Sequence, residues 1–196
     1  MSSGVDEFLD AVRQIDEREG SIAALEALKK QPFDHESSYF AARGTLAARV
    51  GNLTESIEAF EHCCKLEPGS AVFRTNLGMA LLDQAIGGAD SGDIDAEIVG
   101  RALIELQQAI ALDQRLGYAL AGLGYAYHLL GQWDHAKGYL DRAIAVEPEL
   151  IMAWYHRGEL MRSLDQIDEA KRCFEAALSL DSQCAPARAS LAQIEV

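Results

Sequence analysis

The sequence is short of the residue types that break helices or build strands. It has only 4 prolines, and aromatic residues make up 7% of its 196 residues. Alanine, leucine and glutamate, which favour helices, recur along the whole chain. No segment shows the sustained alternation of apolar and polar residues that is typical of half-buried strands. Because 49% of the residues are hydrophobic, the chain can bury a core, so the composition excludes complete disorder and predicts an all-α protein.

Positive charge is also scarce. The chain has 17 lysines and arginines against 31 aspartates and glutamates, which gives a formal net charge of −14 at pH 7. A charge of this sign and size repels phosphate backbones and anionic lipid surfaces at long range. We therefore expect no nucleic-acid partner.

Long apolar runs are missing as well. The longest apolar stretch, residues 118–131, is interrupted by His128 and is shorter than the roughly 20 residues that cross a bilayer. The first seven residues contain neither a basic nor an apolar stretch of the kind found in secretion signals. The sequence therefore predicts a cytoplasmic protein that does not insert into membranes.

No motif of a catalytic or cofactor-binding site is present. The chain lacks a nucleophile elbow, a phosphate-binding loop, an H-E-x-x-H metal motif and the Rossmann glycine pattern. Its four cysteines, at positions 63, 64, 173 and 184, include no C-x-x-C pair, so a structural zinc site lacks its signature and reduced thiols are expected. We expect no catalytic residue, no cofactor and no metal, and thus a protein that is not an enzyme.

An internal period is the most informative feature of the sequence. Four glycines, Gly44, Gly78, Gly124 and Gly158, are separated by 34, 46 and 34 residues. Four large apolar residues, Phe60, Leu106, Leu140 and Phe174, repeat the same three intervals. Two agreeing columns indicate a 34-residue unit with one insertion of 12 residues, and small residues in one column allow close approach of two helices.

These columns resemble the tetratricopeptide repeat, a helix-turn-helix of 34 residues with the pattern W-x2-L-G-x2-Y, then A-x3-F, then Pro. The best copy runs from Leu120 through Gly124 and Tyr127 to Ala136, Leu140 and Pro148. The resemblance implies a right-handed all-α solenoid of about eleven helices. Its predicted parts are a degenerate helical cap at 1–36, repeats at 37–70, 71–116, 117–150 and 151–184, and a capping helix at 185–196. The second copy departs from the pattern at Arg74, where a large apolar residue is usual, so its first helix is expected to pack more loosely.

The insertion falls near residues 87–100, between the two helices of the second repeat. Its glycines and aspartates predict an exposed turn, and Asp93 or Asp95 is expected to cap the following helix. A calcium loop is a weaker alternative, because Ile104 stands where such a loop ends in Glu. The acidic residues of this segment and of residues 1–36 either keep the protein soluble or form a docking surface for a basic partner.

The resemblance implies that the first helices of the repeats line a concave face that holds a partner peptide or helix. Candidate residues of this peptide-binding groove are those large or polar side chains that fall on first helices: Asn76, Met79, Tyr118, Tyr125, His128, Met152, Tyr155, His156 and Arg162. About half of the tyrosines are expected to pack between repeats instead. His128 and His156 lack a third ligand for a metal site, so hydrogen-bonded or solvated histidines are expected there. The groove also lacks most lysines and asparagines of the subclass that grips a chaperone's terminal carboxylate.

The sequence therefore predicts a scaffold or adaptor, of a chaperone-like kind or not, that binds a protein or peptide in its groove. The alternative is a structural scaffold that assembles by end-to-end stacking of its repeats into a homo-oligomer. The two differ in the expected size of the particle in solution, which is concentration-dependent only for the second.

Overall fold

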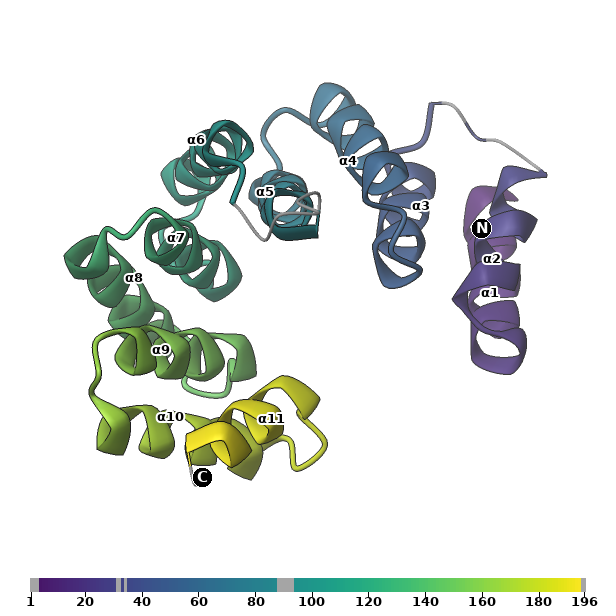
Figure 1. Ribbon diagram of the computed structural model, residues 1–196. Helices are drawn as coiled ribbons and strands as arrows, with labels where there is room; N and C mark the ends of the chain where they lie inside the picture. The colour runs from purple at the N-terminus through teal and green to yellow at the C-terminus, as the bar shows by residue number, and fades with distance from the viewer. Residues whose placement is uncertain (1–3, 31–32, 34, 88–93, 195–196) are drawn as a thin grey trace. The chain divides into compact units, whose positions relative to one another are not determined.

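The computed structural model describes residues 4–30, 33, 35–87 and 94–194. These residues form eleven α-helices and no strand (Figure 1), which confirms the predicted all-α solenoid of helical hairpins. The helices are α1 (Gly4–Glu19), α2 (Ser21–Lys29), α3 (Ser37–Arg49), α4 (Leu53–Leu66), α5 (Ala71–Gly87), α6 (Ala96–Leu112), α7 (Gly117–Leu129), α8 (Trp133–Val146), α9 (Ile151–Ser163), α10 (Ile167–Leu180) and α11 (Ala185–Ile194).

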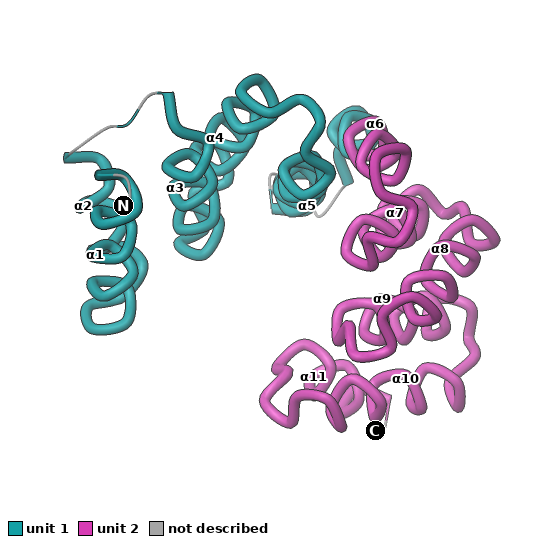
Figure 2. The backbone as a smooth tube through the Cα atoms, turned by 180° about the vertical axis from the view of Figure 1, so that it is seen from behind, with its two compact units in different colours: residues 1–102 teal, residues 103–196 magenta. Residues whose placement is uncertain are grey.

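The contacts of the chain divide it into two compact units, residues 1–102 and residues 103–196 (Figure 2). We call them unit 1 and unit 2; the boundary falls within α6. In unit 1 each helix from α1 to α5 packs against the next one along the chain, and in unit 2 the same holds from α7 to α11. In unit 2 the first helices of successive hairpins also touch, because α9 contacts both α7 and α11.

The glycine column has a steric reason in both units. A Cβ on Gly44 would lie 2.9 Å from the ring of Phe60, and one on Gly158 would lie 2.5 Å from the ring of Phe174. These distances are too short for real carbon atoms, so only glycine lets the two helices of the hairpin pack on these rings. The recurring glycine and the recurring large apolar residue are therefore two halves of one contact.

The turn between the two helices of a hairpin also follows the repeat. It contains a residue with positive φ at equivalent positions, namely Gly51 (77°), Gly131 (70°) and Asp165 (59°). Glycine adopts this left-handed conformation without a steric cost, and aspartate tolerates it better than most residues. In the first hairpin, Asn52 then caps α4, because its side-chain oxygen accepts a hydrogen bond from the Glu55 amide.

The helices at both ends complete the core of their units. In α1 and α2 the apolar side chains of Val12, Leu25 and Leu28 are buried. At the other end, Leu191 and Ile194 of α11 pack on the core formed by α9 and α10. Both terminal segments thus cover apolar surface that a terminal repeat would otherwise expose.

The start of α6 shows how the insertion ends. The Asp95 carboxylate accepts hydrogen bonds from the amides of Glu97 and Ile98, so Asp95 caps α6. Asp93 and most of the predicted turn, residues 88–93, lie outside the described residues.

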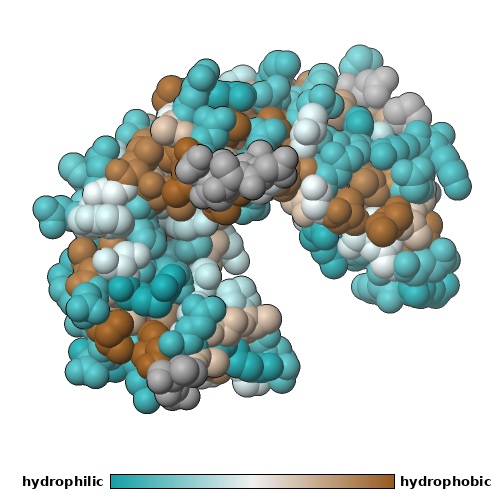
Figure 3. All heavy atoms as spheres, in the orientation of Figure 1, coloured by the Kyte–Doolittle hydropathy of each residue, from teal (hydrophilic) through white to brown (hydrophobic). Residues whose placement is uncertain are grey.

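Hydrophilic side chains cover most of the visible surface, and apolar residues emerge between them in small groups (Figure 3). The most exposed large apolar residues are Ile22, Val72, Ile104 and Tyr118. Among the helices that the structure describes, none combines the length and the apolar character needed to span a bilayer.

Candidate functional site

The first helices of unit 1, α1, α3 and α5, border two adjoining hollows of about 460 and 220 Å³. Thr45 and Arg49 of α3 line both hollows, so the two lie next to each other along the first-helix face of unit 1. The larger hollow is lined by Leu9, Val12, Arg13, Asp16, Ser38, Ala41, Ala42, Thr45, Leu46 and Arg49. The smaller one is lined by Thr45, Ala48, Arg49, Phe60, Asn76, Met79, Ala80 and Asp83. We refer to these residues together as the unit 1 groove.

Small side chains make the space of this groove. Ala41, Ala42 and Ala48 of α3 occupy positions where a larger residue would fill it. A search of the sequence for large or polar side chains on first helices does not select these alanines. The signal that marks them is the run of small residues on one face of a first helix.

Charged groups of both signs line the groove. The Arg49 guanidinium lies 2.5 Å from the carboxylate of Asp16, which also accepts a hydrogen bond from the Ser21 hydroxyl at 2.6 Å. The Ser21 hydrogen bond, together with Arg49, holds the pKa of Asp16 below its ordinary value. At the other end of the groove, desolvation by the surrounding protein raises the pKa of Asp83. The groove thus offers an ionised pair on α1 and α3 and a second carboxyl group on α5.

The predicted groove residues fall into two sets. Asn76 and Met79 lie in unit 1, on the wall of the smaller hollow. The other seven lie on α7 and α9 of unit 2, and there the aromatic ones pack on one another. The imidazole of His156 stacks on the Tyr125 ring with centroids 4.0 Å apart, and the Tyr155 ring is tilted at 5.2 Å on the same imidazole. His156 itself is buried, so it supports the surface rather than forming it.

Burial sets the protonation of the two histidines. It lowers the pKa of His156 to about 3, with a further contribution from nearby His128. Burial also lowers the pKa of His128, although the Glu159 carboxylate opposes this shift. Both imidazoles are therefore neutral at pH 7.

The remaining polar groups of this face are partly paired. His128 Nε2 lies 2.9 Å from the Ser163 hydroxyl, and Arg162 donates to one carboxylate oxygen of Glu159 at 2.6 Å. The Nδ1 atoms of both histidines and the other Glu159 oxygen are buried without a hydrogen-bond partner among the described residues. No group of three or more His, Cys, Asp or Glu side chains in the described part of the chain is arranged to hold a metal ion.

Exposure separates the predicted residues of unit 2 further. Tyr118, at the start of α7, is 51% exposed, and the Arg162 side chain is 42% exposed. Met152 is half-buried against the core of α7 and α8. Tyr118 and Arg162 are thus the predicted residues of unit 2 that present most surface to a ligand.

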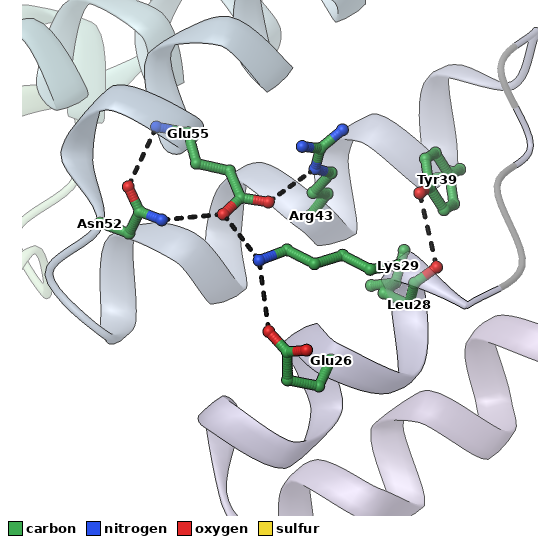
Figure 4. Close-up of polar contacts among 7 residues, drawn as sticks. All are labelled: Glu26, Leu28, Lys29, Tyr39, Arg43, Asn52 and Glu55. Atoms are coloured by element: carbon green, nitrogen blue, oxygen red, sulfur yellow. Dashed lines mark hydrogen bonds and ion pairs between the residues drawn. The ribbon is translucent and has the colours of Figure 1, made fainter.

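An ion-pair cluster joins three helices of unit 1 (Figure 4). The buried Glu55 of α4 accepts from Arg43 of α3 at 2.8 Å and pairs with Lys29 of α2 at 3.1 Å. Burial alone would raise the pKa of Glu55, but Arg43 and Lys29 outweigh it and lower the pKa. Each charge of this cluster already has a partner within the protein, and the partners come from different helices. The cluster therefore holds the three helices together.

The same pair recurs in the last repeat. Arg157 and Glu169, which lie 114 residues after Arg43 and Glu55, are also 2.8 Å apart. Arg157 pairs in addition with Asp141 of α8 at 2.8 Å and donates to the Cys173 sulfur at 3.0 Å. Such pairs match no catalytic motif in the sequence. Because they occupy equivalent positions in two repeats, we interpret them as structural contacts of the repeat.

Sequence models of the tetratricopeptide repeat family match residues 37–70 and 151–184. The human mitochondrial import receptor subunit TOM70 is 29% identical over 159 residues, which are 79% of this chain and 25% of the receptor subunit. This chain therefore spans about a quarter of the length of that relative.

Solved structures show the same fold. A thermophilic TPR protein of Thermus thermophilus, TTC0263, has a TM-score of 0.80 at 21% identity and covers 97% of this chain and 98% of its own. YrrB, described as a TPR protein with an unusual peptide-binding site, has a TM-score of 0.59 at 16% identity and covers 93% of this chain and 89% of its own.

Proposed function

We propose that this chain, which belongs to the tetratricopeptide repeat family, is a scaffold that binds a peptide segment of a partner protein in the unit 1 groove. Stacked helical repeats use their extended surfaces for protein–protein interaction. The relatives support this class of function, since TOM70 is an import receptor subunit and YrrB has a peptide-binding site by their descriptions.

The observation that carries the proposal is that two hollows adjoin at Thr45 and Arg49. The larger hollow has a volume within the range of about 300 to 1,000 Å³ that ligand sites occupy. Its small side chains let a peptide backbone approach α3, and Asn76 and Arg49 can hydrogen-bond to the peptide's polar groups.

We propose the first-helix face of unit 2 as a further contact surface for the partner. Tyr118, Met152 and Arg162 would contact the ligand there, because tyrosine, methionine and arginine are enriched in protein interfaces. Tyr125, Tyr155, His128 and His156 would act mainly by holding this face in shape, since their rings and ring nitrogens contact one another or neighbouring residues.

The groove is tested with peptides selected from a displayed library of random sequences, about 12 residues long, on the immobilised protein. Thr45 is exposed in the centre of the groove, so Thr45→Trp fills the space without burying new surface in the core. A selected peptide should bind this variant at least tenfold more weakly than the parent. Thr54→Trp places the same side chain on the exposed outer surface of α4 and should leave the affinity unchanged. Equal affinity for all three proteins would place the peptide elsewhere.

Self-assembly by end-to-end stacking stays the alternative prediction. The exposed residues of α11 are small or polar, among them Arg188, Ala189, Ala192 and Gln193, and such a face gives little apolar area for a stable contact. We therefore expect a molecular mass that does not change with concentration. Static light scattering over a hundredfold concentration range measures it.

A further inference from the structure

Unit 2 has a hollow of about 480 Å³ outside the surfaces proposed above. It lies among α8, α9 and α10 and is lined by Asp141, Ile144, Trp154, Arg157, Glu169, Arg172, Cys173 and Ala176. Arg157 lies about 200° around α9 from Tyr155, since successive helix residues are about 100° apart. The hollow therefore opens on the side of α9 turned away from its first-helix face.

The first repeat shows what fills the corresponding place there. Positions in the first and fourth repeats correspond when they are 114 residues apart, so Trp154 matches Phe40 and Ala176 matches His62. In the first repeat the His62 imidazole stacks on the Phe40 ring, with centroids 4.6 Å apart and an interplanar angle of 8°. Phe40 is only 5% exposed beneath it. In the fourth repeat an alanine replaces the stacking ring, and the hollow lies beside Trp154.

The charges of the lining residues leave the hollow without a net charge. Arg157 is held by Asp141 and Glu169, and Arg172 lies 3.5 Å from Glu169. Because both guanidinium groups lie beside carboxylates and the charges balance, the lining has no excess of charge that would attract an ionised occupant of either sign. The Trp154 indole nitrogen donates to the Pro148 carbonyl at 2.8 Å, so the indole offers its ring face rather than its N–H group. A ring without charge is the side chain that fits these surroundings.

We propose that this hollow, called here the Trp154 site, binds an uncharged aromatic side chain of a partner protein, which stacks on Trp154 as His62 stacks on Phe40 in the first repeat. The inference does not depend on the unit 1 groove, because the two sites share no residue and lie in different units. The Trp154 site would give unit 2 a second contact with the partner, specific for one aromatic side chain.

The test uses the full chain with nitrogen-15 in its two tryptophans, and Trp133→Phe assigns the indole signal of Trp154. The probe is N-acetylphenylalanine amide, compared with the leucine and arginine analogues. The phenylalanine probe should shift the Trp154 signal saturably, because a stacked ring changes the field at the indole. The leucine analogue should bind several-fold more weakly, and the arginine analogue should not saturate.

Ala176→His rebuilds the side chain of the first repeat inside the hollow and should weaken binding of the phenylalanine probe at least tenfold. Glu175→His adds the same side chain one residue away on the exposed side of α10 and should bind like the parent. Circular dichroism checks that both variants are folded. If Ala176→His does not fold, Trp154→Leu removes the stacking surface, and saturation transfer to the probe should then be lost.

Three outcomes would overturn the proposal. They are the absence of a saturable shift in the parent, equal binding by the parent and the variant that fills or removes the site, and tighter binding of the arginine analogue, which would indicate a cationic occupant.

Discussion

The buried histidine of unit 2 predicts how the stability of this protein depends on pH. The pKa of His156 is about 3 in the folded chain and about 6.5 in an unfolded one. Below pH 6.5 the unfolded state therefore binds a proton at this site that the folded state does not. The stability that depends on a neutral His156 is fully present above about pH 6.5 and is lost progressively as the pH falls towards 3.

The size of the effect follows from the shift. Each pH unit between the two pKa values changes the free energy of unfolding by about 1.4 kcal/mol. From about pH 6.5 to about pH 4.5 the folded protein should therefore lose about 2 to 3 kcal/mol through His156 alone. This is a large part of the roughly 5 to 15 kcal/mol that stabilises an ordinary domain.

The measurement is urea unfolding at pH 7 and pH 4.5, followed by tryptophan fluorescence. Both tryptophans lie in unit 2, so the signal reports the unit that contains His156. His156→Phe keeps a ring between Tyr125 and Tyr155 but cannot bind a proton, and the ionised carboxylates are the same in both proteins. The parent should lose about 2 to 3 kcal/mol more than the variant between the two pH values. Equal losses would show that His156 is not desolvated as the packing requires.

Two further substitutions test the contacts that hold the hairpins. Gly158→Ala places a methyl group against the Phe174 ring and should destabilise unit 2 by about 1 to 3 kcal/mol. Gly138 has open space around it, so Gly138→Ala should be neutral or stabilising by about 0.5 to 1 kcal/mol. Thermal unfolding compares the two variants, and equal melting temperatures would refute the steric argument. Glu55→Ala leaves Arg43 and Lys29 without their shared carboxylate and should cost about 2 kcal/mol. Glu58→Ala, on the exposed side of α4, should stay within about 0.5 kcal/mol, and a loss as large as that of Glu55→Ala would contradict the role of the cluster.

The repeat could be read from the sequence because it depends on local contacts. A glycine and a large apolar residue that meet in one hairpin are separated by a fixed number of residues, as Gly44 and Phe60 are. The helices of each hairpin and the turns between them follow from this spacing and from the positive φ at Gly51 and Gly131. The all-α solenoid, and the eleven helices of the residues that the structure describes, therefore follow from the sequence.

Asn76 and Met79, which line the unit 1 groove, could be selected from the sequence. The selection depended on the size and polarity of side chains, and these do not show which way a side chain faces. Whether a large side chain faces solvent or its neighbour depends on helices from different repeats. Tyr125 and His156 were both candidates for a ligand surface, yet their rings stack on each other, because α7 and α9 come into contact.

Only the tertiary structure decided where space is left. A hollow is a difference between the volume that neighbouring helices enclose and the volume that their side chains fill, and no single residue carries it. Ala41 and Ala42 of α3 are inconspicuous in the sequence, and they gain importance only because α1 lies across the hollow from them. Ala176 likewise becomes informative only beside Trp154, where the first repeat has a stacked pair of rings.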